Sequence, residues 1–275
     1  MYMVLKRLLK LHLIAGALVI LNGFGACAHP ANNNSLKDTA VVVNDTQALA
    51  EDTPSACCSD TAVKAEEVKK PRKVSILGDS YSTFEGYIPK GNIAWYKPVP
   101  KEGRPTDVTK VDQTWWKIFI DRNGYELEKN NSYSGATVCN TGYGKKDYTS
   151  QSFVTRLSDL GNPDLILIFG GTNDSWADSP IGSYVWKNWT KKDLYSYRPA
   201  TAYMLSKLQE QHPDAEIIMI INDELKPEIV ESTKTICDHY GVKYLVTDHI
   251  TKMSDHPDQA GMISLADQLQ KVLNK

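Results

Sequence analysis

The sequence predicts an α/β protein with a central, mostly parallel sheet and helices on both faces. Short apolar runs typical of strands alternate along the chain with segments of helical periodicity. The runs DLILIFGG (164–171) and EIIMIIN (216–222) are continuously apolar, as in strands that are covered on both faces. The alternation begins only near Lys73, so one α/β domain is expected over residues 73–275.

The elements follow one another in a regular order. The predicted strands are 74–78, 125–131, 164–171, 216–222 and 242–247. The predicted helices are 114–124, 198–213, 226–241 and a last one from about Pro257 to about Leu273. Asn123-Gly124 and Gly241 are the expected stop signals of the first and third of these helices.

The first 27 residues have the composition of an export signal. Lys6, Arg7 and Lys10 are followed by an almost wholly apolar stretch and then by small residues before Cys27. A membrane-spanning anchor is the alternative, but the apolar run is shorter than the roughly 20 residues that a span needs. We therefore expect the protein to be exported.

The end of this signal predicts a lipid anchor. Phe24-Gly25-Ala26-Cys27 resembles a bacterial lipobox, with Phe24 where leucine is usual, and Cys27 would then be lipidated and become the mature N-terminus. Cleavage by an ordinary signal peptidase around Ala26-Cys27-Ala28 is the alternative. Such an anchor is the only membrane contact that the sequence predicts.

Residues 28–72 are predicted to be a flexible linker. They are rich in Asn, Thr, Asp, Ala and Lys and contain no aromatic residue. A segment of this composition cannot bury enough apolar area to offset the entropy lost on ordering. The sequence therefore divides into a signal (1–27), a tether (28–72) and a folded domain (73–275).

Charge and cysteine content exclude several classes of function. The formal net charge is −2, and no basic run interleaved with aromatic residues indicates a nucleic-acid partner. No cofactor or metal is expected, because Gly142-Tyr143-Gly144 lacks the strand–loop–helix context of a dinucleotide site and no CxxC pair is present. Export would allow disulfides, whose pairing cannot be read from the five cysteines Cys27, Cys57, Cys58, Cys139 and Cys237.

Small and polar residues gather where strands end. The carboxyl ends of parallel strands meet at one sheet edge, which directs attention to four loops. These loops, 78–86, 131–144, 170–190 and 248–261, carry Gly78-Asp79-Ser80, Ser134-Gly135, Gly171-Thr172-Asn173-Asp174 and Asp255-His256-Pro257. Each signature alone has an ordinary explanation, such as a turn at Asp79-Ser80 or a helix cap at Asn173-Asp174.

Taken together, the four signatures resemble the SGNH (GDSL-type) hydrolases, which are serine esterases on a flavodoxin-like sheet. The resemblance covers residues 73–275, and Gly-x-Asn-Asp after an apolar strand is its most specific part. It implies a three-layer α/β/α sandwich. The strings TDVTKVDQTWW, NNSYSGATVCNTGY and GTNDSWADSPIGSY are similar to an exported, lipoprotein-like subgroup from gut Bacteroidetes.

Ester hydrolysis needs a nucleophile, a base and donors for the developing oxyanion. The resemblance implies that Ser80 attacks the acyl carbon and that His256 takes and returns its proton. The expected oxyanion donors are the backbone N–H groups of Ser80 and Gly135 and the side-chain amide of Asn173.

The residue that orients His256 departs from the family pattern. Met253 stands where the family usually has an aspartate. Asp255 is the expected substitute, although neighbouring side chains in an extended chain point apart, so it would need a local turn. Asp248 or a backbone carbonyl in a Ser–His dyad are the alternatives.

The function predicted from these features is that of an exported serine esterase that removes small acyl groups, acetyl above all, from a carbohydrate or other small ester. Aromatic residues in two insertions, 84–113 and 175–197, could contact that substrate or pack against one another as a lid. A non-catalytic glycan-binding lipoprotein that keeps the fold is the alternative.

Overall fold

The computed structural model describes residues 70–274, and its centre is a five-stranded sheet in the order β2-β1-β3-β4-β5. All neighbouring strands pair in parallel. The strands are β1 (Lys73–Gly78), β2 (Glu126–Ser132), β3 (Leu165–Phe169), β4 (Glu216–Ile221) and β5 (Lys243–Val246). The predicted α/β class is confirmed, and this strand order is that of flavodoxin-like folds.

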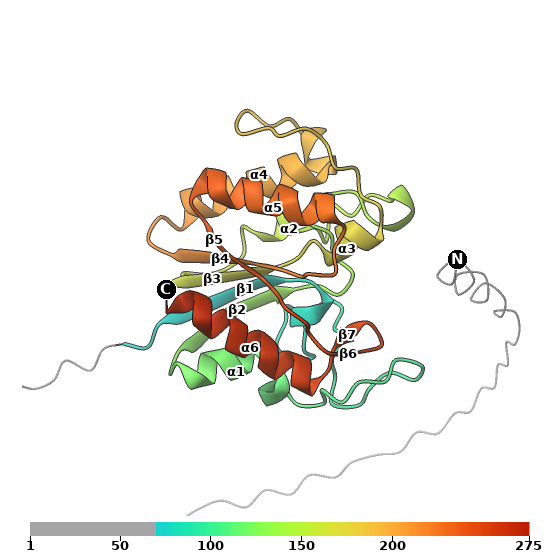
Figure 1. Cartoon of the computed structure of the whole chain (residues 1–275), viewed down its shortest axis with the longest axis vertical. Coiled ribbons are helices and arrows are strands. Elements are labelled where there is room, and N and C mark those ends of the chain that lie inside the picture. The colour runs from blue at the N-terminus through green and yellow to red at the C-terminus, as the bar shows by residue number, and fades with distance from the viewer. Residues whose placement is uncertain (1–69, 275) are drawn as a thin grey trace, which may run out of the picture. The chain divides into compact units, whose positions relative to one another are not determined.

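Helices cover both faces of the sheet and make three layers (Figure 1). On one face lie α1 (Trp115–Arg122) and α6 (Gln259–Leu273). On the other lie α2 (Phe153–Arg156), α4 (Tyr197–Gln211) and α5 (Pro227–Tyr240). A five-residue helix, α3 (Thr172–Trp176), follows β3 directly.

The continuously apolar strands divide their side chains between two cores. All five residues of β3 are buried. Ile166 and Ile168 belong to the core that includes α4 and α5, whereas Leu165, Leu167 and Phe169 belong to the core that includes α1 and α6. Because successive side chains of a strand point to opposite faces, a strand in the middle of three layers must be apolar on both.

Strand pairing brings the first and third signature loops, 78–86 and 170–190, together. Gly78, the last residue of β1, pairs with Phe169, the last residue of β3, and the Asp79 N–H donates to the Phe169 carbonyl at 3.3 Å. The chain passes from β1 to β2 on one side of β1 and then to β3 on its other side, so the strand order reverses at β1. Open α/β sheets bind their ligands at such a switch point.

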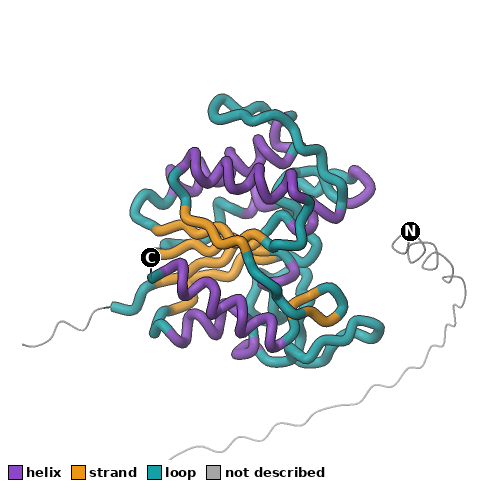
Figure 2. Tube along the Cα trace, in the orientation of Figure 1, coloured by secondary structure: helices purple, strands orange, loops and turns teal. Residues whose placement is uncertain are grey.

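A small hairpin outside the main sheet carries the fourth signature (Figure 2). Strands β6 (Lys252–Met253) and β7 (His256–Pro257) pair antiparallel. The two residues between them, Ser254 and Asp255, have φ values of 53° and 61°. Two left-handed residues are what a tight two-residue hairpin loop of type I′ requires.

The predicted strands and long helices are confirmed, and each of their predicted ends lies within two residues of the end in the structure. The sequence did not indicate α2, α3 or the β6–β7 hairpin, which are too short to show a period. Asn173 and Asp174 lie inside α3, whose N-cap is Gly171, and are not caps themselves. Of the described cysteines, Cys139 and Cys237 are buried and free.

The export signal, the lipobox at Cys27 and the linker lie outside the described residues, apart from the last few linker positions. Within residues 70–274, none of the helices has the length and hydropathy to cross a membrane.

Candidate active site

Ser80 stands at the point where β1 leaves the sheet. A short 3-10 helix begins with Ser80 itself, and the Asp79 carboxylate caps this helix by accepting the Tyr81 N–H at 3.0 Å. The preceding Gly78 has no room for a side chain, because a Cβ there would lie 2.5 Å from the Ser82 Cβ and 2.6 Å from the Ser132 Oγ. The small residues around Ser80 therefore let the chain turn tightly, as the sequence indicated.

Ser80 and His256 are 176 positions apart in the sequence, and the structure brings them into hydrogen-bond contact. The Ser80 Oγ lies 2.9 Å from the His256 Nε2. Both side chains are buried, with exposed fractions of 2% and 6%. A serine hydroxyl at this distance from a neutral imidazole can lose its proton to the ring as it attacks an acyl carbon.

The other ring nitrogen of His256 meets a backbone group and not a carboxylate. Nδ1 lies 3.0 Å from the Ser254 carbonyl oxygen. The structure thus departs from the expectation for Asp255, whose side chain is exposed. The type I′ loop is the physical reason: it turns the Ser254 carbonyl toward the ring, and the Tyr81 hydroxyl donates to the Asp255 carbonyl at 2.8 Å. The Asp248 carboxylate contacts His249 instead.

Aromatic side chains enclose the His256 ring. Trp95 stacks on it with ring centroids 3.4 Å apart and planes 5° from parallel, and Tyr81 packs edge-on at 5.1 Å. Burial disfavours the charged imidazolium and lowers the pKa of His256 to about 4. At neutral pH the ring is therefore neutral, the form that can accept a proton.

Gly135 supplies an unused backbone donor beside this pair. The neighbouring N–H groups are engaged, that of Ser134 with the Ile93 carbonyl at 2.9 Å and that of Ala136 with the Tyr133 carbonyl at 3.1 Å. The Gly135 N–H donates to no backbone carbonyl within residues 70–274, and neither does the Ser80 N–H. Gly135 has φ +85°, a conformation that favours glycine, while a Cβ there would meet open space.

The Asn173 side-chain amide is fixed in one orientation. Its Nδ2 donates to the Ala136 carbonyl at 2.9 Å, and its Oδ1 accepts from the Tyr143 hydroxyl at 2.8 Å. Because a carbonyl oxygen can only accept, the amide nitrogen must face Ala136. The second Nδ2 hydrogen remains for another acceptor. The sequence did not single out Tyr143 as a site residue, since its role depends on a contact between separate loops.

Asp174 anchors the loop that carries Gly135. Its buried carboxylate accepts the Val138 N–H at 2.7 Å and the Cys139 N–H at 3.2 Å. Burial raises the pKa of Asp174 to about 6 and that of Asp79 to about 7, because desolvation penalises the charged form more than these hydrogen bonds favour it. Both aspartates hold backbone in place and make no hydrogen bond to His256.

A cavity of about 350 Å³ opens over these residues. Its lining includes Ser80, Gly135, Asn173 and His256, so the four loops do meet at one site as expected. Around them lie Ile93, Trp95, Arg104, Ser134, Tyr143 and Trp176. Within residues 70–274, no group of three or more His, Cys, Asp or Glu side chains could hold a metal ion.

The two aromatic insertions behave differently. Trp95 and Arg104 of the first insertion, 84–113, line the cavity. From the second, only Trp176 at its start lines the cavity. Tyr184 and Trp186 stack on each other at 5.2 Å, and Trp186 stacks on His239 of α5 at 3.9 Å. The second insertion therefore covers helices rather than the site.

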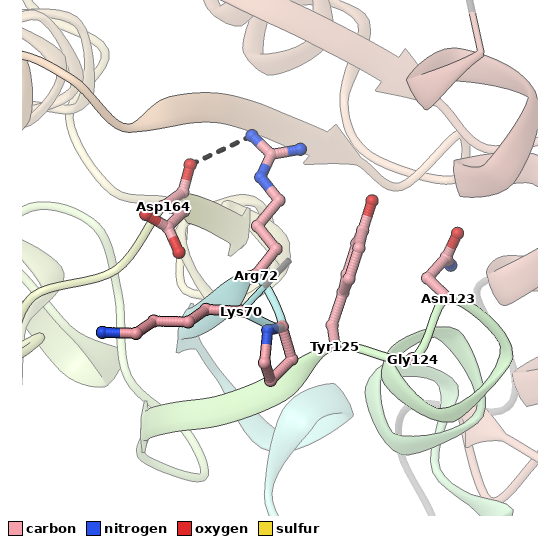
Figure 3. Close-up of a pocket in the computed structure, with 7 residues that line it drawn as sticks. Lys70, Arg72, Asn123, Gly124, Tyr125 and Asp164 are labelled. Carbon is pink, nitrogen blue, oxygen red and sulfur yellow. Dashed lines mark hydrogen bonds between the residues drawn. The ribbon is translucent and has the colours of Figure 1, made fainter. Parts of the chain in front are cut away.

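A larger cavity of about 660 Å³ lies at the opposite, amino-terminal edge of the sheet (Figure 3). It is lined by Lys70, Pro71, Arg72, Asn123, Gly124, Tyr125 and Asp164. Arg72 donates there to the Asp164 carbonyl at 3.0 Å. None of its described lining residues is a serine, cysteine or histidine, so it lacks the groups that acyl transfer needs.

Comparison with known proteins agrees with this geometry. The sequence pattern of the GDSL-like lipase/acylhydrolase family matches residues 72–273. A GDSL-like lipase from Bacteroides uniformis is 51% identical, with a TM-score of 0.73, and the match covers 75% of this chain and 97% of that one. A second from Bacteroides ovatus is 48% identical, also with a TM-score of 0.73, over 75% and 99% of the two chains.

A carbohydrate esterase shares the fold at 17% identity, with a TM-score of 0.54 over 76% of this chain and 70% of that one. No match was found among the curated proteins that were compared. A Ser–His pair at the switch point of a 2-1-3-4-5 sheet and a family match over nearly the whole described domain lead to one conclusion: the chain belongs to the GDSL-like lipase/acylhydrolase family, the SGNH hydrolases, and is an ester hydrolase.

Proposed function

We propose that the protein is an exported serine esterase that removes small acyl groups, acetyl above all, from a carbohydrate, with Ser80 as nucleophile and His256 as base. The observation that carries the proposal is the 2.9 Å contact between the Ser80 Oγ and the His256 Nε2. The small cavity above them, of about 350 Å³, favours a short acyl group over a long chain.

The reaction follows from the positions of the donors. His256 takes the Ser80 proton as the oxygen attacks, and the negative charge that develops on the acyl oxygen is met by the N–H groups of Ser80, Gly135 and the Asn173 amide. The imidazolium then gives its proton to the leaving alcohol. Water repeats the cycle on the acyl-enzyme and releases the acid.

In this proposal Ser80 and His256 act as a catalytic dyad, without the carboxylate that would complete a triad. The Ser254 carbonyl accepts from the His256 Nδ1–H and so fixes the tautomer that leaves Nε2 free to take the proton. A neutral acceptor stabilises the imidazolium less than a carboxylate does. Stacking on Trp95 holds the ring plane in addition.

A carbohydrate is the proposed source of the ester because an exposed indole ring, that of Trp176, lines the cavity. Trp95 and Trp176 lie on its lining, and Trp176 is 43% exposed. Flat aromatic faces with polar edges suit sugar rings, which present C–H faces and hydroxyl edges. The fold is shared with a carbohydrate esterase whose active site has catalytic and non-catalytic binding functions.

The test is hydrolysis of 4-nitrophenyl acetate and of longer 4-nitrophenyl esters by the full chain. We expect activity on the short esters, and a loss of about 10³-fold or more in Ser80→Ala and His256→Ala. Asn173→Ala is expected to lose about 10²–10³-fold.

Asp255→Asn is the matched control for the dyad, because its carboxylate is exposed and does not contact the ring. It should keep the wild-type rate. A fall as large as that of His256→Ala would return the orienting role to Asp255. Equal rates for the wild type and Ser80→Ala, from folded samples, would refute the proposed nucleophile.

Export and lipidation at Cys27 are part of the proposal and have their own test. Expressed with its signal in a Gram-negative host, the protein should fractionate with membranes and incorporate a labelled fatty acid. Cys27→Ser should lose the label and leave the membrane fraction. A wild-type protein that carries no label and is found in the soluble fraction would contradict the anchor.

A further inference from the structure

The cavity over Ser80 and His256 contains one full charge. Among its described lining residues, Arg104 is the only one that is ionised at neutral pH, since the buried His256 is neutral. No carboxylate of residues 70–274 lies within ion-pair distance of the Arg104 guanidinium. The nearby Lys252 differs, because it is paired with Glu224. Arg104 thus has its charge and its donors unused.

The position of Arg104 is coupled to the reacting pair through one side chain. Its guanidinium carbon lies 5.0 Å from the ring centroid of Trp95, which is itself stacked on His256. A cation–π contact does not use up the hydrogen-bonding capacity of the guanidinium, so N–H groups of Arg104 remain available to an acceptor. The backbone N–H of Arg104 donates to the Lys101 carbonyl at 2.9 Å and so closes a turn in the loop that carries Arg104.

These features describe an anion site within reach of the ester. A guanidinium presents N–H groups in a planar fork that matches a carboxylate bidentately, whereas neutral sugar hydroxyls give it no such partner. A role limited to supporting Trp95 would need only a cation over the ring, which lysine also supplies. The arginine fork and the unpaired charge both favour a carboxylate on the substrate.

We propose that Arg104 binds a carboxylate of the substrate, and that the protein deacylates an ester of an acidic sugar. This inference rests on the proposed function. We assign the carboxylate to the alcohol part, as in an acetylated uronic acid, because the exposed indole of Trp176, which lines the same cavity as Arg104, suits a sugar ring. A carboxylate on the acyl part, as in a half-ester of a dicarboxylic acid, would present the same chemistry to Arg104.

The experiment compares charged and neutral esters of matched shape, using the full chain. The first pair is a mono-O-acetylated methyl glucuronide and its uronamide. The second pair is mono-4-nitrophenyl glutarate and its methyl ester. For each pair the measured quantity is the ratio of kcat/KM for the charged ester to kcat/KM for the neutral one. This ratio cancels any general effect of a variant on the catalytic groups.

We expect the wild type to prefer the acetylated glucuronide over its amide by about tenfold. The preference should shrink as salt is added, because the site is open to solvent. In Arg104→Gln the ratio should fall to about one, and Arg104→Lys should retain only part of it. Lys101→Gln, which removes a charge from the same loop but not from the cavity lining, should keep the wild-type ratio.

Each result decides the inference. A preference confined to the glutarate pair and lost in Arg104→Gln supports the anion site and moves the carboxylate to the acyl part. Ratios near one in the wild type, or ratios that Arg104→Gln leaves unchanged, overturn the inference alone. Absence of Ser80-dependent hydrolysis of all four esters overturns the proposed function, and the inference with it.

Discussion

Burial governs the chemistry of His256. The ring is stacked on Trp95 and contacts the Ser254 carbonyl, and neither neighbour carries a negative charge. Desolvation is the largest influence on its pKa and outweighs the opposite effects of the hydrogen bond to the Ser254 carbonyl and of the Asp255 charge. A histidine in such a place is a weaker base, but its ring remains unprotonated, and so able to accept a proton, in mildly acidic solution.

The pH profile should show this. The pKa of His256 is lowered from 6.5 to about 4, so the neutral base persists as the pH falls, and kcat/KM for 4-nitrophenyl acetate should drop only near pH 4. Hydrolysis by Ser80→Ala is subtracted at each pH, and circular dichroism verifies that the protein is folded. A midpoint near 6.5 would contradict the effect of burial on His256 or show that Asp79 or Asp174, whose pKa values are raised to about 7 and about 6, controls the rate instead. The unfolded chain takes up this proton first, so the group also costs stability as the pH falls from 6.5 toward 4.

Tyr143 is predicted to position Asn173. Removing its hydroxyl in Tyr143→Phe frees the Asn173 Oδ1 and lets the amide rotate, so kcat for 4-nitrophenyl acetate should fall by roughly tenfold with little change in KM. Tyr148→Phe is the control, because that ring lies on the same loop and its hydroxyl makes no hydrogen bond within the described chain. Equal kcat values for the two variants would show that Asn173 needs no such support.

At the scale of elements, the β6–β7 hairpin and helix α6 act as one unit. The Asp258 carboxylate caps α6 through the Gly261 N–H at 2.8 Å and also accepts from the Thr251 hydroxyl at 2.6 Å. The Asp258 N–H donates in turn to the Thr251 carbonyl at 3.2 Å. The helix start thus closes the loop that presents His256, and a displacement of one should move the other.

Gly261→Ala tests this link. A Cβ at position 261 would lie 2.2 Å from the Thr251 carbonyl oxygen, which is backbone and cannot rotate away, so α6 must shift. We expect the free energy of unfolding in urea to fall by about 1–3 kcal/mol and kcat to decrease. Ile263→Ala, on the exposed side of the same helix, should change stability by no more than about 0.5 kcal/mol. Wild-type stability and kcat in Gly261→Ala would exclude the coupling.

At the scale of the whole molecule, the sheet separates two apolar cores. One lies between the sheet and the helices α4 and α5, the other between the sheet and the helices α1 and α6. Side chains of the same strand alternate between the cores, so the two share a backbone but not their packing. Energetic changes in one core should therefore leave the other largely unaffected.

Ile236→Val in α5 and Ile120→Val in α1 probe the two cores separately. Each residue is almost fully buried, and each change should cost about 0.5–1.5 kcal/mol. The double variant should lose the sum of the two within about 0.5 kcal/mol, as measured by urea unfolding. A coupling above 1 kcal/mol would show that the sheet transmits strain between its faces.

The sequence by itself determined the layers, the strands and the loops that carry the candidate site. Continuous apolar runs and helical periods are local patterns, and strands that alternate with helices indicate a parallel sheet with helices on both faces. The rule that ligands bind beyond the carboxyl ends of the strands then directed attention to four loops, and the resemblance to the SGNH hydrolases to Ser80, Gly135, Asn173 and His256 within them. All four line one cavity in the structure.

Only the tertiary structure decided what holds these residues. The contact of His256 with the Ser254 carbonyl depends on a type I′ loop between strands too short to show a pattern, and a backbone acceptor has no residue-type signature. Trp95, Arg104 and Tyr143 reach the site from loops whose aromatic and charged residues could equally have packed elsewhere, as Trp186 does on His239. Local patterns specify elements, whereas loop contacts arise only when distant segments are packed together.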